Sequence, residues 1–77
     1  MKLCCMFENN EFDYDLLEEV EKNLYRCIKC GALYKAFKHN DKVLFIQVDN
    51  YLGKEYKGLP YIYMENKQPL YYESYYE

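Results

Sequence analysis

The sequence lacks the segments that would place it in a membrane or divide it into several domains. No stretch approaches the roughly 18 apolar residues that a membrane-spanning helix needs. The apolar run at residues 3–7 ends at Glu8 and is too short for the core of a secretory signal. No repeat and no Ser/Gly-rich linker interrupts the 77 residues. We therefore expect one soluble, cytoplasmic domain spanning residues 1–77.

The sequence is also poor in residues that mark a catalytic site. It has one histidine, three glycines and no tryptophan. It contains neither a Gly-rich phosphate loop nor a nucleophile motif around a serine. A catalytic zinc would need an open coordination position and a nearby general base, and no motif marks either. We expect a protein that is not an enzyme.

What the chain does contain is charge and tyrosine. The formal net charge of −3 gives no general attraction to nucleic acid or to an anionic membrane. Eleven tyrosines can cover a small core while staying wettable, or can form a protein interface.

A chain this short buries only about 60% of its unfolded surface. Such domains often rely on a disulfide, a metal or an oligomeric interface for stability.

The pattern of apolar residues predicts a small α+β fold. The spacing of Leu16, Leu17, Val20 and Leu24 places them on one face of a short N-terminal helix. Asp15 and the glutamate three residues later resemble a capping box at its start. We expect this helix to pack on an antiparallel sheet of three to four strands.

Strand patterns fill most of the remaining chain. Residues 3–7 suggest a short first strand, and 24–26 with 32–38 suggest a hairpin. Residues 42–48 are apolar on both faces except for Gln47, as in a strand covered on two sides. Residues 61–64 are predicted to form another strand, with 49–60 as a loop or a loose hairpin. The tail, 70–77, is expected to be an edge strand or a frayed terminus.

One motif carries definite chemistry, the sequence Cys27-Ile28-Lys29-Cys30-Gly31. Two residues between cysteines let both sulfurs reach one tetrahedral ion at about 2.3 Å. Gly31 can take the positive φ that the position after the second cysteine often needs. Reduced thiols of a cytoplasmic protein more often indicate metal than disulfide.

The stretch YRCIKCGALYK resembles the knuckle of zinc-ribbon proteins, in which CxxCG lies at the tip of a hairpin. The resemblance covers roughly ten residues and implies a structural zinc ion held by Cys27 and Cys30. Zinc ribbons supply a second CxxC, which this sequence lacks. The candidates for the missing ligands are Cys4, Cys5 and His39.

Each of these candidates meets a geometric condition. Neighbouring residues on a strand point to opposite faces, so Cys4 and Cys5 can share one ion only if the backbone bends there. His39 should lie at the far end of the hairpin, about 25 Å away if the strand is fully extended. Two other interpretations stay open for the cysteines, as unligated core thiols or as a redox pair.

Two functions follow from these features. The first is a zinc-stabilised domain that acts by binding another protein. The second is a zinc ribbon that binds single-stranded nucleic acid through the basic middle of the chain. Its basic side chains would be Arg26, Lys29, Lys35, Lys38 and Lys42, interleaved with the aromatic residues Tyr25, Tyr34 and Phe37. The net negative charge argues against this second function.

Overall fold

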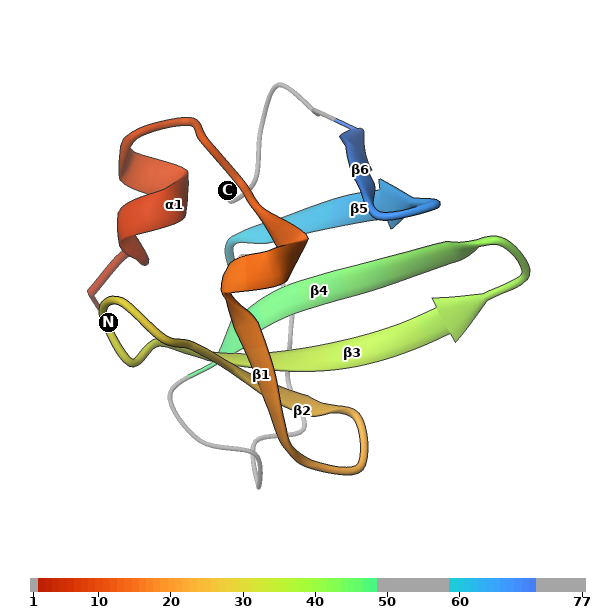
Figure 1. Ribbon diagram of the computed structural model, residues 1–77, viewed down its shortest axis with the longest axis horizontal. Coiled ribbons are helices and arrows are strands. Elements are labelled where there is room, and N and C mark those ends of the chain that lie inside the picture. The colour runs from red at the N-terminus through yellow and green to blue at the C-terminus, as the bar shows by residue number, and fades with distance from the viewer. Residues whose placement is uncertain (1, 49–58, 71–77) are drawn as a thin grey trace.

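The computed structural model describes residues 2–48 and 59–70, which form a curved antiparallel sheet with a short helix beside it (Figure 1). Helix α1 (Cys5–Glu8) and the 3-10 turn η1 (Tyr14–Leu16) come first. The strands are β1 (Leu17–Glu21), β2 (Leu24–Cys27), β3 (Leu33–His39), β4 (Lys42–Val48), β5 (Tyr61–Glu65) and β6 (Gln68–Leu70). Each strand pairs with the next in the chain, so the sheet is a six-stranded meander.

The predicted α+β class is wrong. The described residues form six strands rather than three to four, and helix α1 is only four residues long. The two strands at the edges of the sheet, β1 and β6, are the ones that the predicted sheet of three to four strands did not include. Glutamates dominate β1 and a proline lies within β6, so neither segment has the composition of a typical strand. Charged residues and proline are nevertheless common on edge strands, where one side of the backbone needs no partner.

The helix predicted over residues 15–24 does not form. A hairpin of β1 and β2 takes its place, with Leu17 opposite Cys27. Asn23 turns the chain between the two strands at φ 62°, a left-handed conformation that no right-handed helix contains. Val20, expected on the buried helix face, is exposed. The predicted capping box also fails, because Asp13 rather than Asp15 caps η1 by accepting from the Asp15 N–H at 3.0 Å.

The strand predicted at residues 3–7 is likewise wrong. Cys4 is extended, at φ −62° and ψ 145°, but Cys5 already begins α1. The helix turns Met6 and Phe7 onto the sheet, where both are buried. This segment therefore contributes to the core as a cap over one sheet face, rather than as a strand within it.

Three other predictions are confirmed. The hairpin that flanks the CxxCG motif forms from β2 and β3. The strand at 42–48 and the strand beginning at Tyr61 are β4 and β5, which pair with each other. The predicted loop at 49–60 lies largely outside the described residues, as does the tail beyond Leu70, which itself ends β6.

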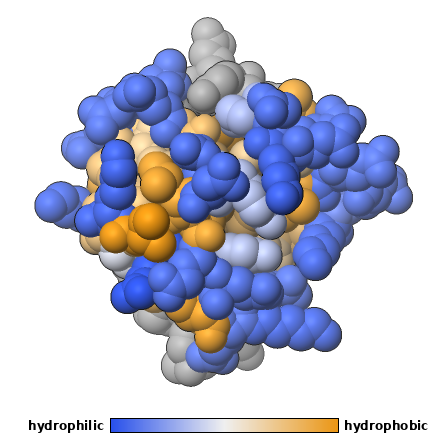
Figure 2. Space-filling view, viewed as in Figure 1, coloured by the Kyte–Doolittle hydropathy of each residue, from blue (hydrophilic) through white to orange (hydrophobic). Residues whose placement is uncertain are grey.

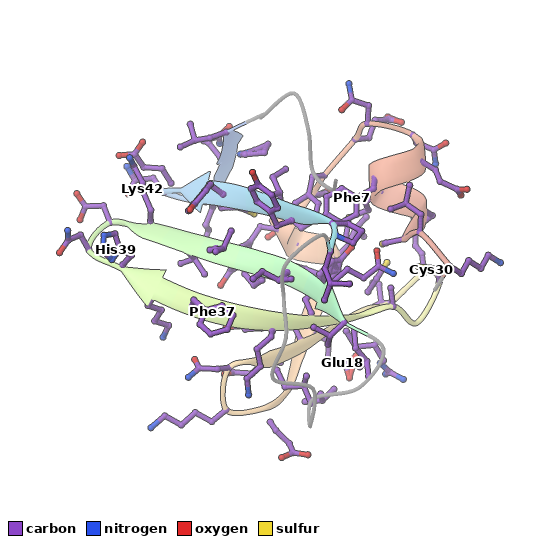
Figure 3. The ribbon with its side chains drawn as sticks, turned by 180° about the vertical axis from the view of Figure 1, so that it is seen from behind. Phe7, Glu18, Cys30, Phe37, His39 and Lys42 are labelled. Atoms are coloured by element: carbon purple, nitrogen blue, oxygen red, sulfur yellow. The ribbon has the colours of Figure 1, made fainter. Side chains whose placement is uncertain are left out.

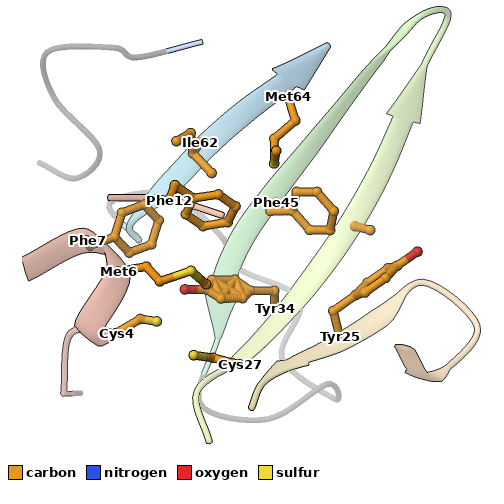
Figure 4. Packing of buried hydrophobic residues seen from close by; sticks show 11 residues of the cluster. Cys4, Met6, Phe7, Phe12, Tyr25, Cys27, Tyr34, Phe45, Ile62 and Met64 are labelled. Atoms are coloured by element: carbon orange, nitrogen blue, oxygen red, sulfur yellow. The ribbon is translucent and has the colours of Figure 1, made fainter. Parts of the chain in front are cut away.

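An aromatic core covers the sheet face that lies beneath α1 (Figure 4). Phe45 of β4 is completely buried at its centre. Its ring centroid lies between 5.1 and 6.4 Å from those of four other rings. These belong to Phe12, Tyr14, Tyr25 and Tyr34. The N-terminal segment thus lies against the sheet, which brings its cysteines to the end of β2.

Removal of the central ring should be costly. We expect Phe45→Ala to lower the free energy of unfolding by about 3–5 kcal/mol, because the buried ring leaves a cavity among its aromatic neighbours. Urea denaturation measures this change. The matched control is Phe37→Ala on the adjacent strand, whose side chain is 37% exposed and whose loss should cost less than half as much. Equal losses for the two variants would contradict the assigned core.

Candidate metal centre

Four cysteine sulfurs meet at one end of the sheet. Cys4 and Cys5 come from the start of α1, Cys27 ends β2, and Cys30 lies in the turn that follows. The four Sγ atoms all lie within 4.8 Å of one another. The Sγ atoms of Cys4 and Cys30 are 3.5 Å apart, and those of Cys5 and Cys27 are 3.9 Å apart. Figure 4 shows the side chains of Cys4 and Cys27 pointing toward each other.

The backbone bends between Cys4 and Cys5, as it must if both side chains are to reach one metal ion. Cys4 has extended backbone, whereas Cys5 is the first residue of α1. The Cys4 carbonyl accepts hydrogen bonds from the N–H groups of Phe7 and Glu8, at 3.0 and 3.1 Å, which fix this change of direction. Neighbouring side chains of a continuous strand would have pointed apart. The helix start therefore allows both sulfurs to join the cluster.

The CxxCG motif forms a tight, hydrogen-bonded turn between β2 and β3. The Cys27 N–H donates to the Ala32 carbonyl at 2.9 Å, and the Gly31 N–H donates to the Cys27 carbonyl at 2.9 Å. Gly31 has φ 82°, as the sequence predicted, a conformation that costs glycine no steric strain. The Ile28 N–H donates to the Leu16 carbonyl at 2.9 Å, which ties the turn to η1.

The spacing and chemistry of the four sulfurs suit a tetrahedral metal ion. Four sulfurs at about 2.3 Å from a central ion lie about 3.8 Å from one another, close to the separations observed. A disulfide would require about 2.05 Å, and all four residues are free cysteines. A site with four sulfur ligands favours soft transition metals. The four sulfurs are therefore close enough together to bind one metal ion.

The thiols differ in acidity. Burial raises the pKa of the Cys4 thiol to about 12, and burial together with the neighbouring thiols raises the pKa of Cys5. Burial also acts to raise the pKa of Cys30, but hydrogen bonds from the backbone N–H groups of Cys5 and Ala32 and with the side chains of Cys4 and Cys27 lower it to about 7. Several thiolates so close together repel one another unless a cation lies among them.

The cluster has a buried side and an exposed side. Cys4 and Cys27 are 1% and 0% exposed, whereas Cys5 is half-buried and Cys30 is exposed. A cavity of about 340 Å³ borders the exposed side, where Lys2 and Glu8 line it together with Cys5 and Cys30. An ion can thus reach the cluster from solvent while two of its ligands stay within the core.

Gln47 is a residue whose role the sequence did not predict. It is 2% exposed, the one buried residue with a polar side chain among the described residues apart from tyrosine and cysteine. Its Oε1 accepts the Cys4 N–H at 2.9 Å, and its Nε2 donates to the Lys2 carbonyl at 2.6 Å. In the sequence, Gln47 is the single polar residue within the apolar run 43–48, and this was the signal that could have indicated its role. Gln47 attaches the backbone at Cys4 to the sheet.

His39 is not part of the cluster. It ends β3, at the opposite end of the hairpin from Cys30, as the spacing predicted (Figure 3). The long strand between them separates the two residues, so His39 cannot complete a site with the cysteines.

The residues proposed for nucleic-acid binding do not form a single face. Arg26 pairs with Glu18 at 3.2 Å. Lys35 and Lys38 are three residues apart on β3, so their side chains leave opposite faces of the sheet. Tyr25 and Tyr34, expected to stack on bases, are both buried in the core. Lys29 lies in the CxxCG turn, apart from these strands.

No protein-family model matches the chain, and neither the curated proteins nor the solved structures include a match. Among residues 2–48 and 59–70, no helix is long and apolar enough to cross a membrane.

The Gln47 hydrogen bonds generate a prediction about stability. We expect Gln47→Leu to lower the free energy of unfolding by about 1–3 kcal/mol, since the buried Cys4 N–H loses its acceptor. Gln68→Leu on β6 makes the same chemical change at an exposed position and should have little effect. Urea denaturation of the two variants and the parent compares them. A parent-like Gln47→Leu would mean that the glutamine does not hold the N-terminal segment.

Proposed function

We propose that this chain is a small, non-catalytic protein-interaction domain whose fold is stabilised by one structural zinc ion. The ligands would be the thiolates of Cys4, Cys5, Cys27 and Cys30. The observation that carries the proposal is the convergence of these four sulfurs within 4.8 Å from two segments distant in sequence. Thiols remain available as ligands in a reducing compartment such as the cytoplasm, which is the location we propose.

Zinc is the metal that this set of ligands favours. Four cysteine ligands in a tetrahedron are typical of structural zinc sites. Such a site is coordinatively closed, because the protein supplies all four ligands and leaves no position for a substrate or an activated water. This closure supports a structural role for the ion rather than a catalytic one.

The ion would fasten the N-terminal segment to the β2–β3 turn. Binding of a structural zinc can contribute roughly 10 kcal/mol or more of free energy, which adds directly to folding. That amount is comparable to the whole stability of an ordinary domain. It would compensate for the limited core of a chain of 77 residues.

The proposal of a protein partner rests on the surface near the metal centre. Ile28, at the CxxCG turn, is 55% exposed. Figure 2 shows hydrophobic atoms gathered in a patch on a face that is otherwise mostly hydrophilic. A contiguous apolar patch on a polar surface favours contact with another protein. The burial of Tyr25 and Tyr34 removes much of the support for the nucleic-acid alternative.

Substitution of a buried ligand tests the structural role of zinc. We expect Cys27→Ser to lower the melting temperature of the zinc-loaded protein sharply, because an incomplete site loses most of its metal affinity. Addition of a strong chelator to the parent should cause a loss of similar size. The variant itself should no longer respond to zinc or to the chelator. Thermal melting followed by circular dichroism measures all three effects.

A buried substitution outside the cluster provides the control for this experiment. Ala36 is buried on β3, so Ala36→Ser also introduces a hydroxyl into the core. This variant should melt lower than the parent but should retain its full response to zinc. A Cys27→Ser protein that melts like the parent in the presence of zinc would contradict the proposal.

A further inference from the structure

We infer that the Tyr34 hydroxyl is a positioning group for the metal centre, which donates a hydrogen bond to the Cys4 thiolate when the ion is bound. This inference rests on the proposed function and deepens it. It assigns a role to a core tyrosine that is not itself a ligand. It also connects the aromatic core directly to the cluster of sulfurs.

The first observation is the isolation of the hydroxyl. Tyr34 lies on β3 and is 0% exposed. Its oxygen is buried without a hydrogen-bond partner of ordinary geometry. The rings of Phe7, Phe12 and Phe45 pack around it at centroid distances of 6.0, 5.7 and 6.4 Å, and they offer no strong acceptor. Buried hydroxyls nearly always have a partner, so this one requires an explanation.

The second observation is the direction in which the hydroxyl points. In Figure 4 the Tyr34 side chain extends toward the N-terminal segment, on the side of the core where Cys4 and Met6 lie. Burial is the main cause that raises the pKa of Tyr34, and interaction with Cys4 raises it further.

The chemistry of sulfur explains why the bond would form with the metal. A neutral thiol is a weak acceptor, whereas a thiolate is a strong one. Metal binding deprotonates the cysteine. The ion would therefore create the acceptor that the buried hydroxyl lacks. Groups that hydrogen-bond to metal ligands in this way orient those ligands and tune the metal.

The two polar groups beside Cys4 come from one row of the sheet. Tyr34 on β3 lies directly opposite Gln47 on β4. Gln47 accepts the Cys4 N–H, and Tyr34 would donate to the Cys4 Sγ. Cys4 would thus be oriented through its backbone by one residue and through its sulfur by the other.

Tyr34→Phe tests the inference, because it removes the hydroxyl and keeps the ring. We expect the full-length variant still to bind one metal ion, but with zinc affinity reduced roughly 10- to 100-fold in competition with a chelator. In the cobalt(II)-substituted protein, the sulfur-to-cobalt charge-transfer band should shift to lower energy. The shift follows because a thiolate without its hydrogen bond gives up electron density more easily.

Tyr25→Phe is the matched control. Tyr25 is also a buried core tyrosine that packs on Phe45, at 5.1 Å, but its hydroxyl points away from Cys4 and Cys27 (Figure 4). This variant should keep the parent's zinc affinity and cobalt spectrum. A Tyr34→Phe protein with an unshifted charge-transfer band would overturn the inference, even if its zinc affinity fell. A hydroxyl that only supports the fold would lower stability when removed, but would leave the electron density on the Cys4 sulfur unchanged. A parent that binds neither zinc nor cobalt would instead overturn the proposed function.

Discussion

The convergence of four sulfur atoms at one end of the sheet is the constraint on which the rest of the structure depends. It joins the start of the chain, at Cys4 and Cys5, to the turn between β2 and β3. The N-terminal segment forms no strand of the sheet among the described residues, so the cluster, the Gln47 hydrogen bonds and the core contacts of Met6 and Phe7 hold it in place. An ion at the cluster would turn this contact into a cross-link.

The core and the cluster share residues and do not form separate units. Cys4 and Cys27 belong to the same buried group as Phe45. Gln47 fixes the backbone at Cys4, and Tyr34 brings an unpartnered hydroxyl to the same region. Binding or loss of a metal ion at the sulfurs should therefore affect the packing of the whole sheet. This coupling is what a small domain needs if a metal is to replace part of a large core.

Local patterns were sufficient to predict some parts of this structure but not others. The turn at Cys27–Gly31 was predictable because its geometry is contained within five residues. The strand at Lys42–Val48 was predictable because its continuous run of β-branched and aromatic residues fits a strand that is covered on both faces. The helix predicted over residues 15–24 was wrong, because leucines at helical spacing also fit a β-hairpin once Asn23 turns the chain. The meeting of Cys4 with Cys30 depends on how distant segments pack, which no local pattern contains.

Native mass spectrometry of the protein, purified without added metal, shows whether the four cysteines hold an ion. We expect a mass excess equal to one zinc ion, lost in acid as protons displace the metal from the thiolates. Thiol counting on the acidified protein should then find four free cysteines, as in the structure. An excess equal to one iron ion would keep the four-sulfur site but correct the metal. A metal-free mass for a folded protein would contradict a metal-stabilised fold, and would leave the four cysteines as unligated or redox-active thiols.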